Sequence, residues 1–225
     1  MNETDERIEK AWKLREDGNP LDSISLLTQI LNEKLKEQEW DKVIDIAIDM
    51  HISWKNLGKN ENNTEHLNTS ISYLNLCKDI AQRENVPLRN DWYLYMGAIQ
   101  IETEKYDEAI SSYEEYLNQE KPKPEKLADI NAHMGYAKCK KGEKDEGIKM
   151  IKDAIETLDN PSEEFVHEGK NVAIIWKTGA KLFLAKVVED KNEAKSLIQE
   201  IIDESKEKGL GARQKQAETL LKTKI

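Results

Sequence analysis

The sequence predicts an all-α fold, a right-handed α-solenoid of about eleven helices stacked as antiparallel hairpins. Three observations predict it. Apolar residues recur with the 3.6-residue period of helices, while strand-like alternation is absent. All five prolines fall between the periodic segments, where a missing amide donor is tolerated. A pattern of apolar, glycine and acidic positions also repeats 38 residues apart, at 93–113 and 131–151.

The first predicted hairpin joins helices at 3–17 and 21–37. Its turn, 17–20, reads Asp-Gly-Asn-Pro, which favours a chain reversal. The apolar positions of this pair are less regular than those of later segments. Because a terminal repeat must expose one side to solvent, we expect 1–38 to be an atypical first repeat.

The second predicted hairpin joins helices at 39–57 and 64–84 through the polar loop 60–64. Its first helix has apolar and small residues at the same spacing as segment 93–100, where polar Gln100 is the weaker fit at the last place. Its second helix has an apolar stripe on one face. These positions are Val43, Ile46, Ala47 and Met50, then Ile71, Leu74, Cys77 and Ala81.

The clearest repeats lie at 90–158, with predicted helices at 89–103, 106–119, 125–141 and 144–158. Small residues recur at one place in the first helices of the hairpins, as Ala47, Gly97 and Gly135. We expect these residues to lie where the two helices of a hairpin cross, because a larger side chain would force the helices apart.

The C-terminal segments predict helices at 162–189, 191–208 and 212–222. The first is the most apolar part of the chain, and Gly169 and Gly179 interrupt it; Gly169 is a candidate bend or break. A helix that is apolar on nearly all sides is normally covered on all sides, so we expect the last helices to pack against it. We interpret 1–225 as one repeat domain with an atypical terminal part at 162–225.

The repeat resembles the tetratricopeptide repeat (TPR), a 34-residue helical hairpin whose first helix carries W-x₂-L-G-x₂-Y. Tyr93, Met96 and Gly97 stand where that motif has Trp, Leu and Gly, and Ala109 and Tyr113 stand at its alanine and aromatic places. Some positions depart from the motif: Gln100 and Lys138 replace its tyrosine, Gly147 replaces its alanine, and the linker at 119–126 adds four residues.

The resemblance implies a concave groove, lined by the first helices of successive repeats, that receives a peptide or a partner helix. Carried over by spacing, its residues are Asp41, Ile44, Ile48, His51, Asp91, Leu94, Ala98, Ile101, Asp129, Ala132, Tyr136 and Cys139. Chaperone-binding relatives grip a terminal carboxylate with Lys, Arg and Asn. Leu94, Ala98 and His133 occupy places where that clamp needs Lys and Asn, so chaperone-tail recognition is disfavoured.

Charge and hydropathy argue against nucleic acid and membranes as partners. The chain has 34 basic and 44 acidic residues, a net charge of -10, which disfavours nucleic-acid binding. No apolar run approaches the length of a membrane span, and the charged start of the chain is unlike a signal peptide, so we expect a cytoplasmic protein. The basic segment 206–225 is interpreted as a solvated face that complements helix C-termini, in preference to a phosphate or lipid site.

Residues for catalysis or metal binding do not form a recognisable set. The four histidines lie far apart in sequence, without H-x₃-H or H-E-x-x-H spacing, and Cys77 and Cys139 are isolated in apolar helical patterns. Segment 209–211, Gly-Leu-Gly, lacks the lysine of a phosphate loop and is typical of a helix end. We expect no catalytic residue, no cofactor and no metal.

These observations predict a non-catalytic protein-protein interaction module, an adaptor or scaffold that binds a peptide or partner helix in the concave groove. Two alternatives stay open. One is a structural homo-oligomer that buries the same surface. The other is a peptide-sensing regulator, although regulators that act on genes usually carry a helix-turn-helix module and the first forty residues read as a repeat.

Overall fold

The computed structural model describes residues 3–163, 165 and 172–224, and within these it has eleven helices and no strand. This confirms the predicted all-α class. The chain folds as two compact units, Met1–Lys105 and Tyr106–Ile225. The boundary falls between α5 and α6, and the interpretation of 1–225 as one continuous repeat domain stays a prediction.

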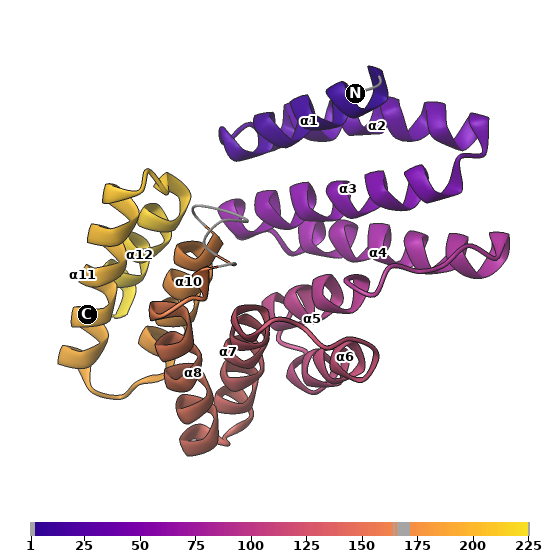
Figure 1. Cartoon of the computed structure of the whole chain (residues 1–225). Helices are drawn as coiled ribbons and strands as arrows, with labels where there is room; N and C mark the ends of the chain where they lie inside the picture. The colour runs from indigo at the N-terminus through magenta and orange to yellow at the C-terminus, as the bar shows by residue number, and fades with distance from the viewer. Residues whose placement is uncertain (1–2, 164, 166–171, 225) are drawn as a thin grey trace. The chain divides into compact units, whose positions relative to one another are not determined.

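The first unit contains two antiparallel hairpins followed by a single helix (Figure 1). Each of the first four helices packs against the next, and α5 packs against α3 and α4. Their inner faces form one core whose members include Leu27, Ile46, Met50, Leu74 and Ile99, all essentially inaccessible to solvent. The elements are α1 (Glu3–Glu16), α2 (Pro20–Glu37), α3 (Trp40–Glu61), α4 (Thr64–Glu84) and α5 (Trp92–Glu102).

Helix α3 runs four residues beyond its predicted end at 57, through Gly58 to Glu61. A Cβ on Gly58 would lie 2.8 Å from the Leu67 side chain of α4. The glycine therefore lets α4 approach α3 closely at this position, and α3 continues through it. Asn62 ends the helix in the left-handed region, and Asn63 caps α4 by accepting the Glu65 amide at 2.9 Å.

A buried polar contact joins the two helices of this hairpin. The Ser70 hydroxyl donates to the His51 carbonyl at 3.0 Å, so the imidazole Nδ1–H donates to the same hydroxyl oxygen at 2.7 Å. His51 Nε2 is buried and has no hydrogen-bond partner in the described part of the chain. Burial, aided by the nearby charge of Lys55, lowers the pKa of His51 to about 3.

His51 is expected to make unit 1 less stable in weak acid. Because its pKa is lowered on folding, its contribution is fully present above the unfolded value near 6.5 and is lost as the pH falls towards 3. Between pH 7 and pH 5 the free energy of unfolding should fall by about 2 kcal/mol. Urea titrations followed by tryptophan fluorescence measure this slope, and His51→Gln should flatten it. An equal slope in both proteins would mean that His51 is not buried in its neutral form.

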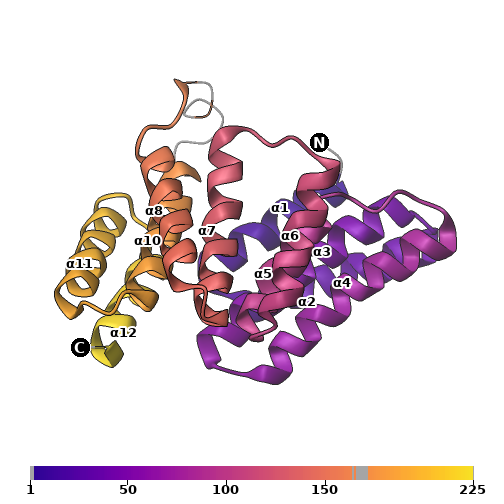
Figure 2. The same cartoon turned by 90° about the horizontal axis from the view of Figure 1, so that it is seen from below.

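The second unit contains α6 (Tyr106–Gln119), α7 (Pro124–Lys141), α8 (Lys144–Asp159), α10 (Val172–Val187), α11 (Lys191–Glu207) and α12 (Gly211–Lys224). Helices α7 and α8 form an antiparallel hairpin, and α10 packs against both (Figure 2). Helices α11 and α12 cover the other side of α10, which confirms that the last helices pack on the most apolar segment. Helix α10 corresponds to the second half of the helix expected at 162–189. The bend or break expected at Gly169 lies outside the described residues.

Two glycines meet where α7 crosses α8. A Cβ on Gly135 would lie 2.7 Å from the Gly147 carbonyl oxygen, and one on Gly147 would lie 2.9 Å from the Cys139 amide nitrogen. The expectation that Gly135 lies at a helix crossing is therefore confirmed. Gly147 of α8, which stands where the TPR motif has alanine, faces Gly135 of α7 at this crossing.

The end of the basic segment binds a helix C-terminus. Lys224 Nζ donates to the Ala185 carbonyl at 2.5 Å and to the Val188 carbonyl at 3.0 Å, at the end of α10. A cation at this position satisfies carbonyl groups without a helical partner and complements the helix dipole. This contact agrees with the interpretation made from the sequence.

Candidate binding pocket in unit 1

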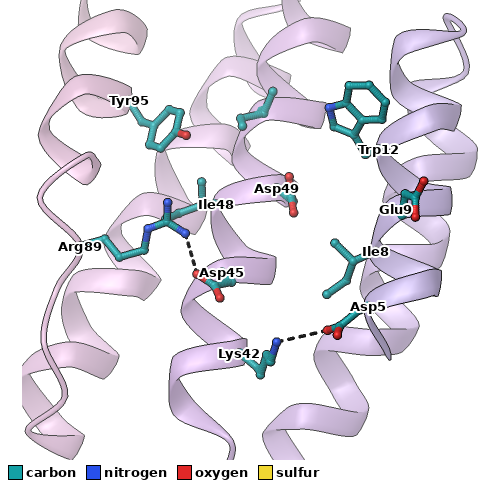
Figure 3. Close-up of a pocket in the computed structure, with 11 residues that line it drawn as sticks. Asp5, Ile8, Glu9, Trp12, Lys42, Asp45, Ile48, Asp49, Arg89 and Tyr95 are labelled. Carbon is teal, nitrogen blue, oxygen red and sulfur yellow. Dashed lines mark hydrogen bonds and ion pairs between the residues drawn. The ribbon is translucent and has the colours of Figure 1, made fainter. Parts of the chain in front are cut away.

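A pocket of about 560 Å³ opens between α1, α3 and α5 in unit 1 (Figure 3). It is called the α1–α3–α5 pocket below. Helices α1 and α3, the first helices of the two hairpins of unit 1, and helix α5 contribute to it, together with the loop before α5. Its lining residues are Asp5, Ile8, Glu9, Trp12, Lys42, Asp45, Ile48, Asp49, Ile52, Arg89 and Tyr95.

One face of α1 forms a wall of the pocket. Asp5, Ile8, Glu9 and Trp12 are spaced i, i+3, i+4 and i+7, so they share one helix face. Ala11, on the flank of this face next to Ile8, is buried in the unit core. Trp12 is 50% exposed, which is uncommon for so large an apolar side chain.

Helix α3 forms the base of the pocket with Lys42, Asp45, Ile48, Asp49 and Ile52. The rest of this helix packs against its neighbours α2 and α4. The pocket face of α3 is therefore mixed, with three charged and two apolar residues, while the other faces are mainly apolar.

Ion pairs link α3 to α1 and to the loop before α5. Lys42 of α3 contacts Asp5 of α1 at 3.3 Å, and Arg89 contacts Asp45 of α3 at 2.7 Å (Figure 3). Arg89 also reaches Asp91 at 2.5 Å. The hydrogen bonds that Arg89 donates to Asp91 and Asp45 raise its pKa further above its already high value. Because these pairs are partly solvent-exposed, they orient the side chains more than they stabilise the fold.

Asp49 is the most enclosed carboxylate of the pocket. Arg15 of α1, whose side chain is 5% exposed and is not part of the pocket lining, donates to it at 3.2 Å. Burial raises the pKa of Asp49, and the opposing effect of Arg15 does not cancel it. The negative charge of Asp49 is therefore less than fully compensated within the protein.

The residues predicted to line a groove are distributed as follows. In unit 1, Ile48 lines the pocket, and Asp91 holds Arg89 at its edge. Seven of the twelve are buried: Ile44, Ile48, His51, Leu94, Ile101, Ala132 and Cys139. Asp41 is exposed outside the pocket lining, and Asp91, Ala98, Asp129 and Tyr136 are partly exposed. Because the twelve residues span both units, the full groove stays a prediction.

Sequence reasoning missed the contribution of α1. Asp5, Ile8, Glu9 and Trp12 have a helical spacing, but the sequence pattern predicts an atypical repeat at 1–38 and no groove residue within it. The large apolar Trp12 beside acidic residues was the available signal. On α3 the lining positions 42, 45, 49 and 52 each follow a predicted position by one residue.

Within the described residues, no group of three or more His, Cys, Asp or Glu side chains could hold a metal ion. Both cysteines, Cys77 and Cys139, are buried as free thiols. Burial raises the pKa of the Cys77 thiol to about 12, so this thiol is protonated and unreactive at neutral pH. None of the helices that the structure describes is long and apolar enough to cross a membrane.

Comparison with known proteins identifies the fold. No family model matches the chain, and no curated protein matches it by sequence. Among the solved structures that match, two are of the nearly identical TPR-like repeats from a Podosopora anserina chain assigned as a kinesin light chain. One of them, a point variant, has a TM-score of 0.58 at 13% identity, covering 93% of this chain and 99% of that chain. The other has a TM-score of 0.57 at 13% identity, covering 92% and 99%. The chain therefore has the fold of a TPR-like helical-repeat protein.

Proposed function

We propose that this chain is a non-catalytic protein-interaction module, an adaptor or scaffold that binds a segment of another protein in the α1–α3–α5 pocket. The observation that carries the proposal is Trp12, an exposed tryptophan on the wall of a concave pocket. Tryptophan is enriched among the few residues that dominate binding energy at protein interfaces.

The size and lining of the pocket support this role. Its volume of about 560 Å³ lies within the range of about 300–1,000 Å³ that is usual for binding pockets. Five apolar or aromatic side chains and six charged ones line it, so it offers both buried contact and fixed charges. TPR-like repeats are typically protein-interaction modules, which agrees with this lining.

We also propose a cytoplasmic location, which the two free, buried cysteines support, since oxidising compartments favour disulfides. Self-association through the same pocket, as in a structural homo-oligomer, would give a mass that rises with protein concentration. A peptide-sensing regulator would instead bind a free peptide without retaining a larger protein.

The test is capture from a lysate of the source organism with matched variants. Trp12→Ala removes the exposed anchor and should weaken retention of a bound protein by at least about tenfold, since truncating an interface tryptophan often costs about 2 kcal/mol or more. Leu21→Ala, at an α2 residue that is 60% exposed and outside the α1–α3–α5 pocket, is the control and should retain the protein fully.

Both residues are at least half exposed, so both variants should remain folded, which their melting curves check. Glutamate at Ile48 or Leu94 would be a poorer probe, because both residues are buried and a charge there would unfold the unit. Equal retention by wild type and Trp12→Ala would contradict the proposed binding site.

A further inference from the structure

The charges of the α1–α3–α5 pocket are unequal. Its lining carries four carboxylates, from Asp5, Glu9, Asp45 and Asp49, against the two basic groups of Lys42 and Arg89. The lining therefore has a net charge of -2, within a chain whose net charge is -10. Such a surface attracts cationic segments and repels anionic ones.

Both basic groups of the lining are already engaged by carboxylates of the protein. Lys42 is paired with Asp5 at 3.3 Å, and Arg89 is held by Asp45 and Asp91 at 2.7 and 2.5 Å. An acidic ligand would have to share either cation with these carboxylates, in an already negative pocket. The arrangement therefore disfavours an acidic segment.

Two carboxylates can accept from a bound cation. Glu9 lies on the α1 wall, where it pairs with Lys13 at 2.8 Å in a solvent-exposed i,i+4 contact that is readily exchanged. Asp49 lies on α3 with 26% of its side chain exposed (Figure 3). Burial raises its pKa despite Arg15, so a second cation would stabilise its ionised form.

Apolar surface lies beside these carboxylates. Trp12 stands one helical turn after Glu9 on the same face of α1, and Ile8 and Ile52 also line the pocket. An arginine or lysine can pack its aliphatic stem, or its charge, over an indole ring while its head group reaches a carboxylate. A neighbouring apolar side chain of the partner would bury the isoleucines.

From this juxtaposition, and resting on the proposed function, we infer that the pocket selects a protein segment in which arginine or lysine stands beside a large apolar residue. The cation contacts Glu9 and Asp49, its stem covers Trp12, and the apolar neighbour packs on Ile8 and Ile52. Neutral or acidic segments are disfavoured because they would cover Glu9 and Asp49 without supplying a further cation to either carboxylate.

The experiment selects binders from a displayed library of random twelve-residue peptides on the full wild-type chain. Peptides that also bind Trp12→Ala are discarded. The remaining peptides should be enriched in Arg or Lys next to Leu, Ile, Phe, Met or Trp. Fluorescence anisotropy with the best labelled peptide then compares wild type with Glu9→Gln and with Glu9→Gln/Asp49→Asn.

The double variant should weaken this peptide by about tenfold or more, and Glu9→Gln alone by a few-fold, because each removes a charge-assisted contact. The control is Asp22→Asn/Asp79→Asn, which changes the net charge equally at exposed residues outside the α1–α3–α5 pocket and should leave affinity within about twofold. Since Glu9 is on the surface, its single variant keeps the test valid if Asp49→Asn weakens the Arg15 contact.

Two results would overturn the inference. Trp12-dependent peptides without enrichment in basic residues, or with affinity unchanged in Glu9→Gln and the double variant, would refute the cationic preference while the proposed binding function stands. A library that yields no Trp12-dependent peptide would count against the inference and the proposed function together.

Discussion

Gly147→Ala is expected to destabilise unit 2 by about 3 kcal/mol or more, and to lower its melting temperature by about 10 °C or more. Alanine normally stabilises a helix by about 1 kcal/mol relative to glycine, so the predicted sign is the reverse of the helix propensity. The reason is that the new Cβ would overlap the Gly135 carbonyl oxygen and lie 2.9 Å from the Cys139 amide nitrogen. Both are backbone atoms, which cannot move aside without separating α7 from α8.

Gly179→Ala is the matched control, in a helix of the same unit. A Cβ at this position would meet only the end of the Arg213 side chain, at 3.3 Å, within the described residues. That flexible group can shift, so Gly179→Ala should be neutral or stabilise the unit by up to about 1 kcal/mol. Differential scanning calorimetry of both variants gives the comparison. Melting temperatures that rise together would show that α7 and α8 do not cross at Gly147.

The second large effect concerns a cluster of charges between α10 and α11. Lys181, with its side chain 8% exposed, reaches Glu200 at 2.9 Å and Glu204 at 3.0 Å. Lys177, 14% exposed, reaches Glu204 at 3.0 Å and Asp159 at 3.0 Å. Burial alone would lower the pKa of both lysines, but their carboxylate partners outweigh it and raise the pKa.

Glu204→Gln is expected to destabilise unit 2 by about 2–3 kcal/mol, because it removes a charge shared by two largely buried lysines. Glutamine keeps the size of the side chain, so the loss reports charge and not packing. The control is Glu207→Gln on the same helix, where the exposed pair with Lys208 should contribute little. Urea unfolding measures both. If Glu204→Gln changes the free energy of unfolding by less than about 0.5 kcal/mol, the other carboxylates compensate Lys177 and Lys181 without the charge of Glu204.

Most of the fold could be predicted from the sequence. Helical periodicity and the prolines place the helix limits of α2, α4, α6, α7 and α8 within a residue or two, because those limits depend on local propensity and capping. Helix α3 extends beyond its predicted end at 57, and Gly58 is the first residue past that end. A glycine near a helix end can either stop the helix or let another helix approach. The tertiary contact with Leu67 of α4 shows that Gly58 does the second.

The pocket was harder to predict than the fold. Successive residues on a helix are rotated by about 100°, so a one-residue error in register turns a wall residue into a buried one. Ile44 and His51 illustrate this, since both are buried while Asp45 and Ile52 line the pocket. The register depends on how each hairpin packs on the next, and an irregular N-terminal repeat gives the sequence no landmark for that packing.

Photo-crosslinking from position 12 tests the binding site most directly. Trp12→p-benzoylphenylalanine and Leu21→p-benzoylphenylalanine place the same reactive group on the pocket wall and on an exposed α2 residue outside the pocket. Irradiation in lysate of the source organism should join one defined protein to position 12 and not to position 21, and the basic peptide selected above should compete for that product. The same products from both positions, or a product made only of two copies of this chain, would contradict the binding of a foreign protein segment in the α1–α3–α5 pocket.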